Sequence, residues 1–459
     1  CYNYPKEKQW RNRHMYNFPK NLFTDVRIER HSFMNFSIKD GEVTSSGKYD
    51  ENGAFIRIFD GEMQYTTCTN DLQNIQREID NLAALAKENK DIYSDPVIKN
   101  FGDSKAEILK YEGDEDIRKI SPEKAEALVR GYIDSCYDNR VTEIKSCIAG
   151  YSAQHTIKEY YSGKGASVKQ DIQRCKVYMS FDFSVNDTPW SVYKTLQGMT
   201  FDSLLNREKE ITEERDRYLD YAKNAVDVTP GEYTCVLAPS VTALFTHESF
   251  GHKSESDYMM NDKTLQQEWK MGKKVGSEKV TICDNGLLDN NGYVPFDDEG
   301  NRAEATYLIK NGVLTGRLHD SKSAAALGEK VTGNSRSQSY EYSPMVRMTN
   351  TFMEKGSDSP EDIIKGVKDG IYVYGVNYGT GCGTFTMQPY LCYRIRDGKI
   401  AEPVRVNVIT GSVFKALFDI DAVGDDFEIF DAFTCGKGGQ TVHVSTGGAT
   451  IRVKSLTVN

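Results

Sequence analysis

The sequence predicts an α+β protein in which helices are concentrated in the first half and strands in the second. Helical periodicity recurs before residue 226, whereas Gly, Thr, Val and short strand-like runs dominate afterwards. A chain of 459 residues is long enough for two or three domains. The turn-rich segment at residues 227–231 (DVTPG) lies where the composition changes. We therefore expect a mixed α+β N-terminal domain over residues 1–228 and a β-rich C-terminal domain over residues 229–459.

The N-terminal region begins with about twenty basic and aromatic residues without periodicity, so residues 1–24 are an extension with no assigned structure. The strands that alternation predicts are Asp25–Arg30, Met34–Lys39, Gly53–Phe59, Glu143–Ile148 and Lys176–Phe183. The polar stretch between Lys39 and Gly53 is predicted to be turns. Helices are predicted from Asn70 to Ala86, over Ser121–Asp138 behind a Ser-Pro-Glu start signal, and over Phe201–Ala225.

The C-terminal region carries short strand candidates separated by turn residues. They are Tyr233–Ala238, Lys279–Cys283, Ala305–Lys310, Val346–Met353, Ile371–Val376, Phe385–Arg396 and Thr450–Val453. Only a few inserted helices are expected there.

Charge and cysteine usage exclude several classes of protein. The 57 Lys and Arg against 67 Asp and Glu give a net charge of −10, and no basic block offsets it, so direct nucleic-acid binding is not expected. No run is apolar enough for a transmembrane helix. The ten cysteines form no C-x-x-C pair and are expected to be reduced, in a cytoplasmic protein. Because the chain starts at Cys1, an exported lipoprotein is the alternative.

The segment Tyr233–His252 carries the sharpest local pattern. A strand is followed by Pro239, by Ser240 as a predicted N-cap, and by a helix with His247, Glu248 and His252. On a regular helix the i, i+5 spacing turns the second histidine roughly 140° from the first. Both can reach one metal only if the helix gains a residue, as in a π-bulge, or ends at Gly251. On this motif alone, two unrelated histidines are the better interpretation.

A family resemblance extends well beyond the motif. The segment GEYTCVLAPSVTALFTHESFGHKSESD resembles the active-site region of the TldD/PmbA metallopeptidases, whose hallmark is H-E-x-x-x-H on a helix after such a strand. The similarity continues through YVPFDDEGNRAEATYLIKNGVLTGRLHD, RMTNTFMEKG and CGKGGQTVHVSTGGATIRVKSLTV, and it includes DVRIERHSFMNFSIKDGEVTSSGKYDENG near the start. These segments follow the family's order over most of the chain. Two departures are Lys253-Ser254, where the family usually has smaller apolar residues, and the segment GTGCGTFTMQPYLCYRI, which replaces a more Ser-rich family stretch.

The resemblance implies the roles of four residues. His247, His252 and Cys435 would bind one Zn²⁺ per chain, and Glu248 would be the catalytic base. Two imidazoles and a thiolate leave one position open for water, whose pKa zinc lowers to about 7. Glu248 would take the proton of that water and pass it to the leaving amine. No substrate-binding residue can be assigned.

Other residues remain alternatives from the sequence. His319 and His443 are rival ligands, and Glu255 and Asp257 are rival carboxylates. Cys435 is preferred because of the family match alone. His319-Asp320 is interpreted as part of a turn or as a group that orients a ligand.

The predicted function is a zinc-dependent peptidase that hydrolyses unfolded peptides or peptide-like products. The resemblance also implies a dimer with enclosed active sites, either with itself or with a paralogue that lacks the motif. An extended peptide would lie as an added strand beside the β-rich domain. The alternative is a non-catalytic binding protein, in line with the family's description as a modulator of DNA gyrase. A structural zinc, closed by a fourth ligand such as Glu255 or His443, is a third interpretation.

Overall fold

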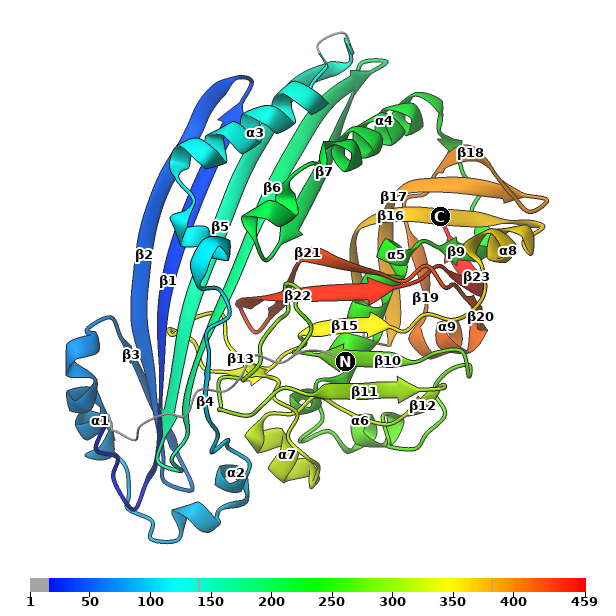
Figure 1. Cartoon of the computed structure of the whole chain (residues 1–459). Coiled ribbons are helices and arrows are strands. Elements are labelled where there is room, and N and C mark those ends of the chain that lie inside the picture. Colours follow the sequence, from blue (N-terminus) through cyan, green and yellow to red (C-terminus); the bar gives the residue numbers. More distant parts are fainter. Residues whose placement is uncertain (1–15, 139–140, 382) are drawn as a thin grey trace.

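The structure, a computed structural model, describes residues 16–138, 141–381 and 383–459. Among these residues, the first part of the chain forms one seven-stranded sheet with the order β3-β2-β1-β5-β6-β4, and β7 pairs with β6 (Figure 1). Its strands are β1 Phe23–Lys39, β2 Glu42–Phe59, β3 Gln64–Thr69, β4 Lys105–Ile108, β5 Ile144–Ser162, β6 Ser167–Val185 and β7 Thr188–Gly198. The expected α+β architecture is confirmed.

The hairpin β1–β2 is longer than the sequence pattern indicates. β1 is continuous and pairs antiparallel with β2 from Phe23–Phe59 to Lys39–Glu42. The chain reverses at Asp40 and Gly41, which both have positive φ angles of 50° and 90°. The prediction of a turn-rich stretch between Lys39 and Gly53 was therefore wrong. Residues 42–50 are exposed, so both faces of this strand are polar and the alternation that reveals a strand is missing.

Four α-helices of the described residues accompany this sheet: α1 Ile75–Ala83, α2 Pro96–Lys99, α3 Pro122–Cys136 and α4 Glu208–Asn224. The Ser121 side chain accepts a hydrogen bond from the amide of Lys124, so the predicted start of α3 is confirmed. The predicted helix from Phe201 is interrupted, because Phe201–Leu204 is a 3₁₀ turn and α4 begins only at Glu208. The buried side chains of α3 and α4 share one core with β5, β6 and β7.

The second part of the chain forms three sheets from the described residues. A six-stranded sheet has the order β12-β11-β10-β15-β22-β21, and an eight-stranded sheet has the order β16-β9-β23-β19-β17-β18-β8, with β20 paired to β23. β13 and β14 form a two-stranded ribbon. The strands are β8 Val226–Asp227, β9 Gly231–Leu237, β10 Ile282–Asn285, β11 Ala305–Lys310, β12 Val313–Leu314, β13 Ser335–Arg336, β14 Met345–Val346, β15 Asn350–Met353, β16 Asp369–Gly381, β17 Thr384–Arg396, β18 Lys399–Arg405, β19 Ile409–Ser412, β20 Ile420–Val423, β21 Glu428–Lys437, β22 Gln440–Gly448 and β23 Ile451–Val458.

The α-helices of the described residues in this part are short: α5 Pro239–Thr246, α6 Lys263–Glu268, α7 Ser321–Leu327, α8 Pro360–Lys365 and α9 Val413–Asp419. α5 contacts β15, β21 and β22 of the six-stranded sheet and β9 and β16 of the eight-stranded sheet. Its residues Val241 and Phe245 are buried in the large C-terminal core. No helix among the described residues is long and apolar enough to cross a membrane. The division of the chain into two domains at residue 228 stays a prediction.

Candidate metal centre

The candidate centre is built on the segment that follows β9. α5 begins at Pro239, with Ala238 as the N-cap residue. Proline suits the first helical position because its missing N–H would have no partner there. The prediction that Ser240 caps the helix was wrong, since the Ser240 hydroxyl donates to the carbonyl of Tyr374 at 3.2 Å.

The helix changes its winding where the histidines lie. α5 passes into a π-helical turn over His247–Gly251, and a 3₁₀ turn over His252–Ser254 follows. The wider π turn offsets the i, i+5 spacing, so the rings of His247 and His252 lie edge to face with centroids 5.1 Å apart. Gly251 permits this turn to pack closely: a β carbon there would lie 2.0 Å from Sδ of Met348. The distortion that the spacing required is therefore present.

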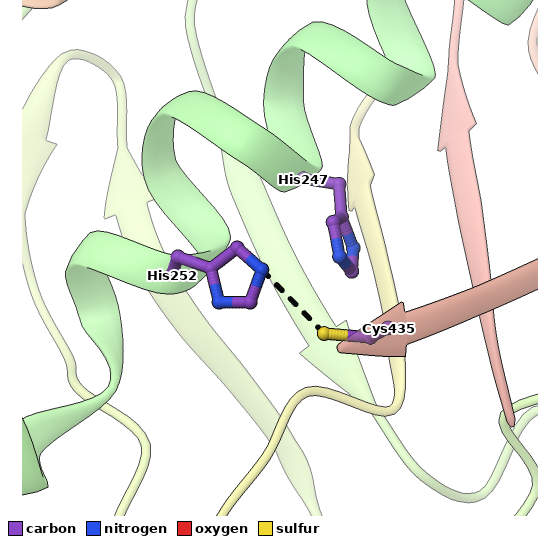
Figure 2. A group of neighbouring side chains, drawn as sticks. All are labelled: His247, His252 and Cys435. Carbon is purple, nitrogen blue, oxygen red and sulfur yellow. Dashed lines mark hydrogen bonds between the residues drawn. The ribbon is translucent and has the colours of Figure 1, made fainter. Parts of the chain in front are cut away.

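A cysteine from a distant strand completes the group. Cys435 lies on β21, which is the end strand of the six-stranded sheet. Its Sγ is 3.5 Å from Nε2 of His252, and one donor atom from each of His247, His252 and Cys435 lies within 4.8 Å of the others. Figure 2 shows both rings and the thiol directed toward a common point. Among the described residues, this is the one group of three or more potential ligands at metal-binding spacing.

A carboxylate contacts the side of the His252 ring that faces away from Cys435. Its Nδ1 lies 3.0 Å from Oε2 of Glu255, a residue with no exposed surface. Because an ionised carboxylate only accepts hydrogen bonds, Nδ1 is the donor and Nε2 faces the centre. A carboxylate behind a histidine in this way sets the tautomer and orientation of a metal ligand.

Lys437 connects this carboxylate to the strand of Cys435. Its Nζ is 3.1 Å from Oε2 of Glu255 and 2.8 Å from both carboxylate oxygens of Asp257, and it also donates to the carbonyl of Val346 at 2.9 Å. The Lys437 side chain is 6% exposed. An ion-paired chain therefore joins the helix that carries the histidines to the strand that carries the cysteine.

The charges of the centre favour a thiolate. Burial raises the pKa of the Cys435 thiol, but hydrogen bonds from His247 and His252 outweigh it and lower the pKa to about 5. Burial lowers the pKa of His252, while its hydrogen bonds to Cys435 and Glu255 raise it to about 10. The thiolate and imidazolium thus stabilise each other. A bound cation would replace the shared proton, because metal binding requires a thiolate and neutral imidazoles.

The donor set fits zinc. Zinc binds both histidine nitrogen and cysteine sulfur, and catalytic zinc sites have three protein ligands with a fourth position open. In a tetrahedral site with zinc–ligand bonds of 2.0–2.3 Å, neighbouring donor atoms are about 3.3–3.6 Å apart, and the separation between Cys435 and His252 is 3.5 Å. The buried Nδ1 of His247 has no hydrogen-bond partner among the described residues.

Glu248 lies between the two histidines in sequence and is half-buried. Burial raises the pKa of its carboxyl group, and the charges of His247 and His252 oppose this rise. β16 runs alongside it: a β carbon on Gly379 would lie 3.5 Å from Cγ of Glu248, and one on Gly381 would lie 3.1 Å from its carbonyl oxygen. The two glycines keep this strand close to Glu248 without a side chain between them.

The rival residues have other partners. His319 Nε2 bonds Oε2 of Glu329 at 2.9 Å, and its Nδ1 contacts the hydroxyls of Ser256 and Ser323. Asp320 caps α7 through the amide of Ser323. His319 and Asp320 are therefore engaged in contacts away from the centre, while Glu255 pairs with His252 and Asp257 with Lys437.

His443 pairs with Thr434 across the β21–β22 ladder and lines a separate cavity. Lys437 is the residue that sequence reasoning missed. The available signal was its position two residues after Cys435 on a strand, which puts both side chains on the same face.

Comparisons with known proteins point to one family. Residues 230–459 match the PmbA/TldA metallopeptidase C-terminal domain, and residues 24–90 match PmbA/TldA metallopeptidase domain 1. A metalloprotease of Methanocaldococcus jannaschii is 29% identical over 444 residues, which cover 94% of this chain and 95% of that protein. A zinc metalloprotease TldD homologue of Saccharolobus solfataricus is 32% identical over 352 residues, which cover 75% and 77%.

Solved structures agree in fold. TldE from Thermococcus kodakarensis superimposes with a TM-score of 0.75 at 16% identity, over 95% of this chain and 96% of that one. A Thermotoga maritima protein described as a candidate modulator of a DNA gyrase also gives a TM-score of 0.75, at 17% identity and the same coverage. At these identities the likeness concerns the fold alone.

Proposed function

The chain belongs to the PmbA/TldD family of metallopeptidases, hydrolases that act on peptide bonds, and we propose that it is a zinc-dependent peptidase acting on unfolded peptides or peptide-like products. The observation that carries this proposal is the meeting of His247 and His252 with Cys435, which lies 183 residues beyond His252 in sequence, close to Glu248. These three residues would hold one Zn²⁺ per chain.

A zinc ion held there would supply Lewis-acid chemistry, since it acidifies water and polarises a carbonyl group. The Glu248 carboxylate accepts the proton of the attacking water and later delivers it to the leaving amine. Burial, which raises the pKa of Glu248, suits a group that must both take and return a proton. Glu255 accepts the Nδ1 proton of His252, so that Nε2 faces the centre and would be the nitrogen that binds the metal.

Substrate selection follows from the position of β21 at the end of its sheet. We expect an extended peptide to add along this β-rich part by backbone hydrogen bonds, which select little for sequence. Such a binding mode requires an unfolded segment and excludes folded proteins. A homodimer, or a heterodimer with a motif-less paralogue, in the cytoplasm is part of the same proposal.

The competing function is a non-catalytic binding protein of the gyrase-modulator type, with a structural or vestigial metal site. A structural zinc would need a fourth protein ligand. Glu255 is committed to His252 and Lys437, and His443 lines another cavity. With three protein ligands, a bound zinc would keep a fourth position for water, which favours catalysis.

Two measurements on the native protein test the proposal. Elemental analysis should find about one zinc per chain, and mass spectrometry should find new peptide termini from an unfolded protein but none from the same protein when folded. Zinc without cleavage of any unfolded substrate would favour the binding protein.

A further inference from the structure

A second polar cavity lies apart from the metal centre. It has a volume of about 440 Å³ and lies between the seven-stranded sheet and the β21–β22 hairpin, two elements that face each other in Figure 1. Thr434 lines this cavity. Since successive side chains of a strand point to opposite faces, Thr434 and Cys435 direct their side chains away from each other. β21 therefore separates the cavity from the metal centre.

The acidic side chains of the cavity are balanced by cations. Glu29 pairs with Nε of Arg27 at 2.8 Å and with Nζ of Lys158 at 3.4 Å. Asp298 pairs with the same two cations, at 3.4 Å and 2.6 Å. Two further acids of the lining, Glu51 and Glu341, are half-buried and exposed, respectively, where water weakens their influence.

Two arginines of the lining have no such counterpart. Arg174 and Arg336 are 8% and 6% exposed, and neither forms an ion pair with a carboxylate of the described residues. Nε of Arg174 donates to the carbonyl of Asn291 at 2.8 Å, which leaves both of its Nη groups without a protein acceptor in the described chain. Arg336 donates to the carbonyls of Met348 and His443.

Carboxylates act on the two arginines only from a distance: the charge of Asp431 raises the pKa of Arg174, and the charges of Asp298 and Asp284 raise that of Arg336, without an ion pair to either. Burial and the charge of Arg336 lower the pKa of Arg174 to about 9. The buried Nδ1 of His443, beside the same arginines, has no hydrogen-bond partner among the described residues. Buried charges are costly unless they are paired. An arginine whose fork faces a cavity is instead suited to bind a planar anion with two parallel hydrogen bonds.

We propose that this cavity binds a carboxylate group through the Nη groups of Arg174, beside Arg336 and His443. A carboxylate fits better than a phosphate, because the lining already holds four acidic side chains, which disfavour a second negative charge on the ligand. The cavity is larger than a carboxylate alone, so the ligand carries further atoms. The C-terminal carboxylate of a short peptide is the source that the proposed function supplies, and that part of the inference rests on the proposed function.

Calorimetry on the full chain tests the site without any turnover. The probes are N-acetyl-dialanine, the same peptide with an amidated C-terminus, and succinate. The wild type should bind the free acid and not the amide. Arg174→Gln should raise the Kd about 10- to 100-fold, the loss of one charge-assisted bidentate interaction. Arg130→Gln removes the same charge from the surface of α3, where Arg130 pairs with Glu126, and should leave the Kd unchanged.

Thermal melting separates a ligand site from a structural arginine. Without ligand, Arg174→Gln should melt no lower than the wild type, because an unpaired buried charge has been removed. The free acid should raise the melting temperature of the wild type and not that of the variant. A lower melting temperature of the unliganded variant, together with unchanged binding, would overturn the proposal.

The probes also distinguish the sources of the carboxylate. Equal binding of acid and amide by the wild type would overturn the carboxylate site, and this comparison needs no variant. Binding of succinate without either peptide would keep the site and overturn the peptide source. Because binding is measured and not hydrolysis, a protein that binds the acid but cleaves no peptide would refute the proposed function and leave this site intact.

Discussion

Nδ1 of His252 and Oε2 of Glu255 are joined by a 3.0 Å hydrogen bond, and the glutamate side chain has no contact with solvent. This bond determines which ring nitrogen of His252 faces Cys435. Lys437 neutralises the same carboxylate and lies on the strand of Cys435. The helix and the strand that supply the candidate ligands are thus joined by buried polar contacts as well as by the shared metal position.

Glu255→Gln is expected to weaken metal binding about 10- to 100-fold, because the amide holds the Nδ1 proton of His252 less firmly. Chelator competition measures the affinity, and the visible spectrum of the cobalt-substituted protein reports the ligand geometry. Glu214→Gln is the matched control, since Glu214 is also buried and accepts a hydrogen bond from Tyr390, outside the centre. Equal affinities of both variants and the wild type would refute a role of Glu255 in positioning.

Lys437→Met is expected to lower the free energy of unfolding by about 3–5 kcal/mol, because it leaves Glu255 and Asp257 without their buried cation. Urea denaturation with a constant m-value measures the change. Adding Asp257→Asn to Lys437→Met should recover part of the loss, since one uncompensated charge is then removed. A double variant as unstable as the sum of the two single variants would contradict this account.

Glu248→Gln is expected to lower kcat for peptide hydrolysis about 10²- to 10⁴-fold, the contribution of a general base. Glutamine has nearly the same shape and cannot accept the proton. The zinc content should stay at the wild-type level, because Glu248 is not one of the three clustered donors. Normal hydrolysis by this variant would rule out the proposed mechanism.

Cys435→Ala is expected to abolish stoichiometric zinc binding, because the site loses its only thiolate and keeps two imidazoles. Elemental analysis after dialysis measures the metal content per chain. Cys68→Ala, which removes an exposed thiol, should keep the full metal content. If both variants retain zinc equally, Cys435 is not a ligand.

Gly251→Ala is expected to destabilise the protein by about 1–3 kcal/mol, because the added methyl group would overlap Met348 and force the π-helical turn to shift. Metal affinity should fall with it, since this turn aligns the two histidines. Gly131→Ala is the contrasting control: Gly131 lies on the exposed side of α3 with open space around it, so alanine should stabilise the helix by about 0.5–1 kcal/mol. Thermal unfolding of both variants measures the difference. A Gly251→Ala variant as stable as the wild type would show that the turn adapts.

Much of the fold was predictable where the signal is local. The start of α3 follows from the Ser121 cap, and the strand Ala305–Lys310 follows from alternation. The strands β18 to β22 were not predicted, because their burial depends on partners far away in sequence. The length of the β1–β2 hairpin was not predicted for a related reason. Where both faces of a strand are exposed to solvent, apolar and polar side chains do not alternate along it.

By itself, the sequence determined that the histidine pair needs an irregular helix. Two side chains that are five positions apart on a regular α-helix point in different directions, and this constraint follows from helix geometry alone. The choice of Cys435 over the other cysteines came from the family resemblance and not from spacing.

Only the tertiary structure decided which side chains surround that pair. It brings Sγ of Cys435 to 3.5 Å from Nε2 of His252 and places Glu255 against Nδ1, on the other side of the same ring. It also pairs Lys437 with the Glu255 carboxylate. It also leaves Arg174 without a carboxylate partner in the described chain. The physical reason is that the winding and capping of a helix depend on residues close in sequence. The partners of a buried charge, in contrast, are the side chains that the folded chain packs against it.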